Sequence, residues 1–174
     1  LRPGTHFLDV GCGCGRVARY LPDESVKSYT GFDRHPGMID WCQAEITTQR
    51  PHFHFHCFDI KSPYAELDGY AGTIDAASFQ FPFADQSYHS ALLASVFTHI
   101  PLEESAHYLK ELYRVLKPSG KILLSVFLTD QEPYSENVAF YHQPEAFLSV
   151  VREAGFSHKF REEIYQHNWY VLTK

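Results

Sequence analysis

The sequence is short of basic residues and of long apolar runs. Among its 174 residues, 15 Lys and Arg stand against 21 Asp and Glu, which gives a net charge of −6. A nucleic-acid-binding surface needs a surplus of basic side chains on one face, so we expect no nucleic acid partner. No segment approaches the roughly 18 consecutive apolar residues of a membrane-spanning helix, and we therefore expect no membrane partner.

Paired cysteines are also absent, since Cys12, Cys14, Cys42 and Cys57 show no C-x-x-C spacing. Cys12 and Cys14 lie within a glycine-rich loop, where a disulfide would distort the turn. Residues 1–4 show no signal-peptide pattern and lead directly into a predicted strand. Free thiols in a reducing compartment are the simplest interpretation, so we expect a cytoplasmic protein.

Three histidines, His52, His54 and His56, alternate along one predicted strand and share one of its faces. Neighbours on one face of a strand lie about 6.5–7 Å apart, so two of them bridge a single ion more readily than three. No acidic residue or cysteine is placed to complete a ligand set. We predict no metal site and interpret the histidines as the polar face of an edge strand.

Short apolar segments alternate with helical segments along the chain. Strands are predicted at residues 7–10, 28–33, 53–59, 91–97, 121–128, 160–165 and 169–173. Helices are predicted at residues 16–21, 36–49, 102–116 and 144–154, and a long loop at 61–78. The alternation predicts an α/β fold, a mostly parallel sheet with helices on both faces, closed by an antiparallel hairpin. We expect one domain, residues 1–174, that lacks an N-terminal helix or lid, because Leu1 is not Met and the first strand follows at once.

The glycine-rich loop that runs from Gly11 to Gly15 is the most informative segment. Ligands of a parallel α/β sheet bind beyond the carboxyl ends of the strands, where glycines let the backbone approach the ligand. A dinucleotide site has the spacing G-x-G-x-x-G, and its third glycine would stand at Arg16. The observed spacing, G-x-G-x-G preceded by Asp9, therefore argues against a nicotinamide oxidoreductase.

Five segments, in chain order, resemble the class I S-adenosylmethionine-dependent methyltransferases of the small-molecule type. They are Asp9-x-Gly11-x-Gly13-x-Gly15, Gly31-Phe32-Asp33-x-x-Pro36-x-Met38-Ile39, Asp59-Ile60, Phe81-Pro82-Phe83-x-Asp85-x-Ser87-Tyr88 and Leu116-Lys117-Pro118-Ser119-Gly120. One position departs from the family pattern, His89, where Asp is usual. The resemblance covers residues 7–128. It implies a Rossmann-like seven-stranded sheet of order 3-2-1-4-5-7-6 with strand 7 antiparallel.

This resemblance implies that S-adenosyl-L-methionine is the cofactor and S-adenosyl-L-homocysteine the product. Asp33 would accept hydrogen bonds from the ribose hydroxyls. Asp59 and Ile60 would contact the adenine, with residues 77–79 as an alternative. The implied cofactor-binding residues are Asp9, Gly11, Cys12, Gly13, Gly15, Asp33, Arg34, Met38, Asp59, Ile60, Ser95 and Phe97.

The acceptor end of the site is predicted from fewer residues. His99 follows the fourth strand and its side chain titrates near neutral pH, so we predict it as the base that takes the acceptor's proton. The alternative is a histidine that caps or packs the next helix. His99, Tyr141 and His142 are predicted to contact the acceptor, with loop packing as the alternative for Tyr141 and His142.

We therefore expect a methyltransferase (EC 2.1.1.-) that acts on a small-molecule acceptor by in-line transfer. A methyltransferase-fold protein that binds the cofactor or a partner without catalytic activity of its own is the alternative. The identity of the acceptor, the atom that is methylated and the choice between monomer and homodimer stay open.

Overall fold

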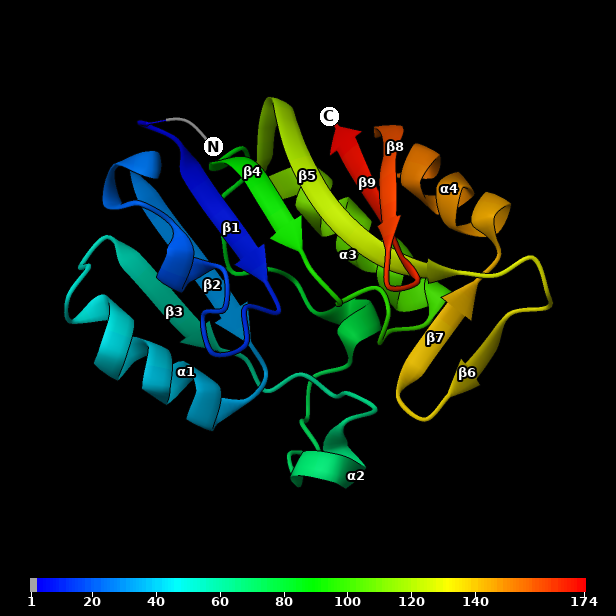
Figure 1. The fold of residues 1–174 in the computed structure, drawn as a ribbon, viewed down its shortest axis with the longest axis horizontal. Coiled ribbons are helices and arrows are strands. Elements are labelled where there is room, and N and C mark those ends of the chain that lie inside the picture. The colour runs from blue at the N-terminus through cyan, green and yellow to red at the C-terminus, as the bar shows by residue number, and fades with distance from the viewer. Residues whose placement is uncertain (1–2) are drawn as a thin grey trace.

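The strands of the protein form one twisted sheet, with helices packed against both of its faces (Figure 1). The computed structural model describes residues 3–174. Its strands are β1 (His6–Val10), β2 (Ser28–Asp33), β3 (Phe53–Cys57), β4 (Tyr88–Leu93), β5 (Leu116–Leu128), β6 (Tyr134–Glu136), β7 (Ala139–His142), β8 (Ser157–Ile164) and β9 (His167–Thr173). Its α-helices are α1 (Pro36–Cys42), α2 (Ala65–Asp68), α3 (Leu102–Val115) and α4 (Pro144–Glu153).

The predicted strand order is confirmed. The parallel strands run in the order β3-β2-β1-β4-β5, β9 pairs antiparallel with β5, and β8 pairs antiparallel with β9. With β8 and β9 as the sixth and seventh strands, this is the order 3-2-1-4-5-7-6. Within residues 3–174 the sheet has two more strands, β6 and β7, because the long strand β5 continues beyond β4 and pairs there with β7.

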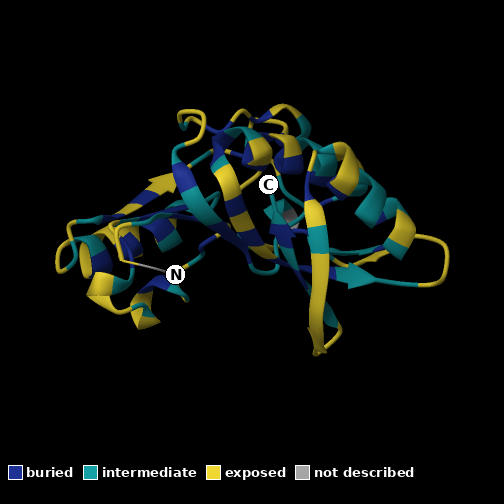
Figure 2. Ribbon diagram, turned by 90° about the horizontal axis from the view of Figure 1, so that it is seen from above, coloured by how far each residue is buried: buried dark blue, intermediate teal, exposed yellow. Residues whose placement is uncertain are grey.

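Two apolar cores lie on the two faces of the sheet, and the side chains of β1 show how alternation divides them. Leu8 and Val10 belong to a core that includes Leu109 of α3 and Phe147 of α4. Phe7 belongs to the other core, which includes residues of α1. Successive side chains of a strand point to opposite faces, so each core takes alternate residues. Figure 2 shows buried residues running through the middle of the molecule, with exposed residues on its outer loops and helix faces.

Several predicted boundaries are wrong. Residues 16–21 contain only a single 3-10 turn, because six residues between a glycine and Pro22 leave little room for more. The helix predicted at 36–49 is α-helical only to Cys42 and continues as a π-helical turn, Gln43–Thr47. The fourth strand spans Tyr88–Leu93 instead of 91–97, and Ser95 behind it has a left-handed backbone (φ 62°).

The fifth strand begins at Leu116 rather than at 121, because the turn before it already pairs with β4. The loop predicted at 61–78 contains the short helix α2 and a 3-10 turn, Ala76–Ser78. The closing hairpin is confirmed as β8 and β9.

The segment ahead of β4 is held by one arginine of α3. Arg114 donates hydrogen bonds to the carbonyl oxygens of Phe81 and Phe83 at 2.8 Å each, and it forms ion pairs with Asp85 and Glu111. The side chain of Glu111 also accepts from the backbone N–H of Phe81 at 2.8 Å. These contacts satisfy backbone groups of the loop and hold the segment that leads into β4, the strand whose far end lies at the site.

In the part of the chain that the structure describes, no helix is long and apolar enough to cross a membrane.

Candidate functional site

A cavity of about 560 Å³ lies at the carboxyl ends of β1, β2 and β4. This is where an open parallel sheet places its ligands, and the volume lies within the usual range for a small-molecule site. Nine of the residues predicted for the site line it: Gly11, Cys12, Gly13, Asp33, Arg34, Met38, Ile60, Ser95 and His99. Six do not: Asp9, Gly15, Asp59, Phe97, Tyr141 and His142.

The three glycines of the loop have left-handed backbones but serve different purposes. A Cβ on Gly11 would lie 2.7 Å from Cγ2 of Val96, and a Cβ on Gly15 would lie 2.5 Å from Cδ1 of Ile46. These two positions exclude side chains because the protein itself fills the space. A Cβ on Gly13 would meet nothing closer than 3.9 Å, yet Gly13 lines the cavity. Gly13 is therefore the position at which a side chain would occupy the ligand's space.

Asp33, the last residue of β2, stands beside the glycine loop. One oxygen of its carboxylate accepts from the N–H of Gly13 at 2.9 Å, and the other accepts from the N–H of His35 at 3.0 Å. Each carboxylate oxygen has a further lone pair to offer. The contact ties the loop to the end of β2 and leaves an acceptor for hydroxyl groups at the cavity wall.

Asp9 lies beneath the loop and is only 2 % exposed. The hydroxyl of Tyr29 donates a hydrogen bond to its carboxylate. Burial raises the pKa of Asp9 to about 7, although the Tyr29 hydrogen bond opposes the shift. The side chain thus supports the loop from below and does not face the cavity.

Gly15, Asp59 and Phe97 also lie away from the cavity wall. Asp59 is exposed and accepts a hydrogen bond from the hydroxyl of Thr73 at 2.6 Å. Phe97 is fully buried and packs edge-on against Phe147, with ring centroids 5.6 Å apart. A cofactor role for these three residues stays a prediction.

Residues 61–70, which we call the flap, contribute a wall of the cavity that the sequence did not predict. Lys61, Ser62, Tyr64 and Asp68 line the cavity from this segment. Its sequence has no clear period and no family motif, so no local signal could have indicated this placement.

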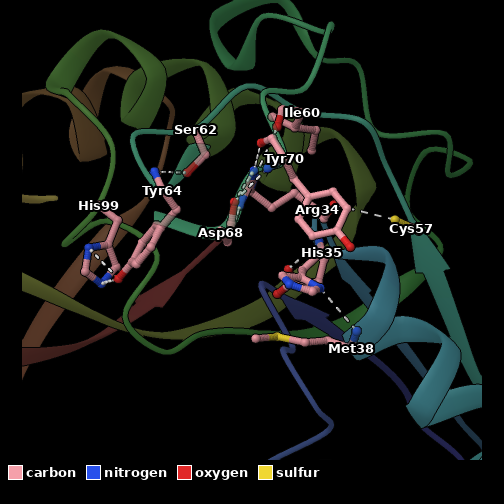
Figure 3. Close-up of polar contacts among 11 residues, drawn as sticks. Arg34, His35, Met38, Cys57, Ile60, Ser62, Tyr64, Asp68, Tyr70 and His99 are labelled. Atoms are coloured by element: carbon pink, nitrogen blue, oxygen red, sulfur yellow. Dashed lines mark hydrogen bonds and ion pairs between the residues drawn. The ribbon is translucent and has the colours of Figure 1, made fainter. Parts of the chain in front are cut away.

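Arg34 holds the flap in place. It forms an ion pair with Asp68 and donates hydrogen bonds to the carbonyl oxygens of Ile60 and Tyr70 (Figure 3). Since Arg34 directly follows Asp33, the flap is fastened next to the carboxylate expected to bind the ribose.

His99 lies at the other end of the cavity, beyond β4. Its Nδ1 lies 2.8 Å from the carbonyl oxygen of Val138, and its Nε2 lies 3.1 Å from the hydroxyl oxygen of Tyr64. Burial lowers the pKa of His99, and the hydrogen bond to Val138 opposes that shift. The ring is therefore neutral near pH 7, as a base must be before it takes a proton.

Tyr141 and His142 belong to β7 and do not reach the cavity wall. Tyr141 is stacked between Phe127 and Tyr134, with ring centroids 5.1 and 4.5 Å away. His142 is 5 % exposed, and its Nε2 lies 3.2 Å from the carbonyl oxygen of Phe97. Contact of either side chain with an acceptor stays a prediction.

Ser95 lines the cavity just beyond the end of β4. Its left-handed backbone is unusual for a residue with a side chain, and its N–H donates to the hydroxyl of Ser125 at 2.9 Å. A non-glycine residue in this conformation costs stability and is found preferentially at functional sites.

Among the side chains that the structure describes, no group of three or more His, Cys, Asp or Glu is placed to bind a metal.

Comparison with known proteins identifies the family. The family described as "Methyltransferase domain" matches residues 8–124. Phosphoethanolamine N-methyltransferase 1 of Zea mays is 24% identical over 171 residues, covering 94% of this chain and 30% of the relative. A demethylmenaquinone methyltransferase of Chlorobaculum parvum is 28% identical over 182 residues, covering 86% of this chain and 65% of the relative.

Solved structures share the fold. The 1,6-didemethyltoxoflavin-N1-methyltransferase of Burkholderia thailandensis, determined with its acceptor and S-adenosylhomocysteine bound, superimposes with a TM-score of 0.71 at 16% identity. The match covers 99% of this chain and 72% of that chain.

The chain belongs to the class I S-adenosylmethionine-dependent methyltransferases. The family and its structural neighbours indicate S-adenosylmethionine and S-adenosylhomocysteine as the cofactor pair. The chain spans less than a third of the length of the first curated relatives that it matches. The cavity fits such a cofactor, because Gly13 leaves its wall open to a ligand and Asp33 presents free lone pairs there.

Proposed function

We propose that residues 1–174 form one catalytic domain that transfers a methyl group from S-adenosylmethionine to a small-molecule acceptor. The observation that carries the proposal is the cavity itself. It joins the open face of Gly13 and the carboxylate of Asp33 at one end to a neutral histidine, His99, at the other. Methyl transfer needs a held donor and, for an O–H or N–H acceptor, a base beyond it.

The cofactor would be held by residues of the first half of the chain. The backbone of Gly11 and Gly13 would lie against it, and Asp33 would accept from its ribose hydroxyls. When bound, S-adenosylmethionine supplies a methyl group on a positively charged sulfur. Further proposed cofactor contacts are Cys12, Arg34, Met38, Ile60 and Ser95, which line the cavity, and Asp9, Gly15, Asp59 and Phe97, which the family resemblance implies and which do not line it.

His99 would act as the base, and Tyr141 and His142 would shape the acceptor side. Alignment of the reacting groups in a closed cavity can supply roughly 7–11 kcal/mol of the barrier reduction. Relatives named for phosphoethanolamine, demethylmenaquinone and 1,6-didemethyltoxoflavin support a small organic acceptor. The four free thiols support a reducing, cytoplasmic location.

Binding and turnover can be measured separately. We expect saturable calorimetric binding of S-adenosylhomocysteine. With S-adenosylmethionine and each of phosphoethanolamine, a reduced demethylmenaquinone analogue and 1,6-didemethyltoxoflavin, mass spectrometry should detect a methylated product in at least one mixture. Binding without any product would favour the cofactor-binding alternative. Absence of binding would contradict the proposal.

A further inference from the structure

Part of the cavity wall is formed by the hydrophobic core that lies between the sheet and α3. The residues of this part belong to one buried cluster, and each is at most 9 % exposed. A wall of this kind suits a flat, largely apolar ring. Its residues, which we call the apolar wall, are Val10, Phe32, Ile60, Ala76, Ile100 and Tyr108.

Tyr108, in the middle of α3, brings a polar atom into the apolar wall. Its ring packs edge-on against Phe81, with ring centroids 5.2 Å apart, and the residue is 5 % exposed. Among the side chains that the structure describes, the hydroxyl of Tyr108 has no hydrogen-bond partner. The fully enclosed side-chain oxygens without a partner are those of Thr98 and Ser105. The Tyr108 oxygen is therefore accessible, and the cavity that the residue lines is where it opens.

A buried hydroxyl without a partner lowers stability, because it has lost its hydrogen bonds to water and gained none in return. A phenylalanine would fill the same place without this cost. Burial raises the pKa of Tyr108, and the negative charges of Glu104 and Asp33 raise it further. The side chain is thus a neutral phenol that can both donate and accept a hydrogen bond. These properties point to a ligand group that pairs with the hydroxyl.

The position of the apolar wall indicates which part of a ligand reaches Tyr108. Phe32 directly precedes Asp33, the carboxylate that we propose for the ribose hydroxyls. The base of a nucleoside is attached to its ribose, so a base would lie against the apolar wall when the ribose lies at Asp33. Adenine is a flat ring whose edge carries acceptor nitrogens and an amino group that donates.

We propose that the hydroxyl of Tyr108 forms a hydrogen bond with the edge of the cofactor's adenine and so contributes to selection of the base. The inference rests on the proposed function. It adds a residue of α3 to the cofactor site, although none of the five sequence motifs includes this helix. Tyr108 is a binding residue with no part in the methyl-transfer step.

The first test is the affinity of Tyr108→Phe for S-adenosylhomocysteine, measured by calorimetry. This variant keeps the ring and removes the hydroxyl, and we expect the affinity to fall about 10-fold. Tyr113→Phe is the matched control, because Tyr113 lies on the same helix, away from the cavity, with its ring packed against Phe156. Equal affinity in Tyr108→Phe and the unaltered protein would overturn the proposal.

The second test separates ligand binding from a structural role of the hydroxyl. Without ligand, the free energy of unfolding of Tyr108→Phe in urea should be no lower than that of the unaltered protein, because no hydrogen bond within the protein is lost. A lower value would show that the hydroxyl supports the fold, and it would overturn the proposal.

The third test identifies the partner atom on the base. Four analogues of S-adenosylhomocysteine each lack one polar group of the adenine: the 1-deaza, 3-deaza, 7-deaza and 6-deamino compounds. One of them should bind the unaltered protein about 10-fold more weakly than S-adenosylhomocysteine does, yet bind Tyr108→Phe as tightly as S-adenosylhomocysteine binds that variant. If Tyr108→Phe weakens all five ligands by the same factor, no pair exists and the proposal is overturned.

Failure of this inference can be told apart from failure of the proposed function. If the unaltered protein does not bind S-adenosylhomocysteine, the proposed function is overturned and this inference with it. Binding that does not depend on Tyr108 overturns this inference alone. All three tests measure binding or stability, so they need no acceptor.

Discussion

The two ends of the cavity are built in different ways. At the cofactor end, the glycine loop and Asp33 follow adjacent parallel strands, β1 and β2, and one hydrogen bond from Gly13 joins them. At the end that we propose for the acceptor, called the acceptor end below, Tyr64, His99 and Val138 come from three separate segments and are in hydrogen-bond contact. The first end depends on strand pairing, whereas the second depends on how the flap and the turn between β6 and β7 meet the segment that follows β4.

The two ends also differ in charge. Asp33 offers a carboxylate to hydroxyl groups, and backbone N–H groups surround it. The acceptor end offers a neutral imidazole and a phenol. A carboxylate such as Asp33 suits the binding of hydroxyl groups, and an imidazole such as His99 suits a proton transfer.

The largest effect should come from a substitution in the glycine loop, at the cofactor end, and it concerns cofactor affinity. Gly13→Val places a branched side chain at φ 54° and in the ligand's space, and we expect cofactor affinity to fall more than about 100-fold. Gly4→Val is the matched control, because Gly4 has φ 83° and open space around it. Calorimetry with S-adenosylhomocysteine measures both variants. Equal affinity of the two would show that Gly13 does not face the cofactor.

The contact of Tyr64 with His99 should survive that change. The NMR signals of His99 in Gly13→Val should match those of the unaltered protein, because the hydrogen bond of Gly13 goes to Asp33 and the change leaves the contact of Arg34 with the flap in place. Altered His99 signals would show that the ends are coupled.

An intermediate effect is expected at Asp9, and it concerns stability. Its pKa of about 7 in the folded protein is above the ordinary value of 3.8, so the folded state binds more protons than the unfolded chain between these pH values. Stability should therefore fall as the pH rises from about 4 to 7. A shift of this size corresponds to about 4 kcal/mol.

Asp9→Asn should remove this dependence. The free energy of unfolding can be measured with urea at pH 4 and pH 8. Relative to the unaltered protein, the variant should be about 2–4 kcal/mol more stable at pH 8 than at pH 4. The exposed Asp130, replaced by Asn, provides the control. If the difference in free energy of unfolding between the variant and the unaltered protein does not change with pH, the buried carboxyl does not titrate in this range.

The smallest effect should come from the ion pair that joins the flap to the cofactor end. Asp68→Asn weakens the contact with Arg34, and partly exposed pairs contribute up to about 1 kcal/mol. We expect S-adenosylhomocysteine to dissociate about two- to fivefold faster in stopped-flow measurements. Glu145→Gln, which breaks the surface pair with Arg152 on α4, should leave the rate unchanged. An equal rate in both variants would show that the flap does not retain the cofactor.

Local sequence was a good guide where one run of residues builds one feature. The second strand, Ser28–Asp33, follows from apolar patterning, and the strand order follows from the resemblance that the ordered motifs carry. Of the predicted cofactor residues, Gly11, Cys12 and Gly13 of the loop and Asp33 at the end of β2 line the cavity. Asp9 and Gly15 differ because a motif specifies that a residue is required and does not say whether a ligand or the protein core requires it.

Sequence was a poor guide where distant segments meet. Tyr64 stands in a stretch without periodicity, and nothing near it in the chain indicates a partner at His99. The hairpin of β6 and β7 was missed because its strands are short and their register is set by pairing with β5.

The sequence by itself determined the family, because the spacing of its glycines, acids and turns is local and can be matched to a family pattern, and through that resemblance it indicated the cofactor and the strand order. Only the tertiary structure decided which glycine faces the ligand, that Asp9 is buried beneath the loop, and that Tyr64 meets His99. Those outcomes depend on which side chains fill the space next to a residue, and the neighbours come from elsewhere in the chain.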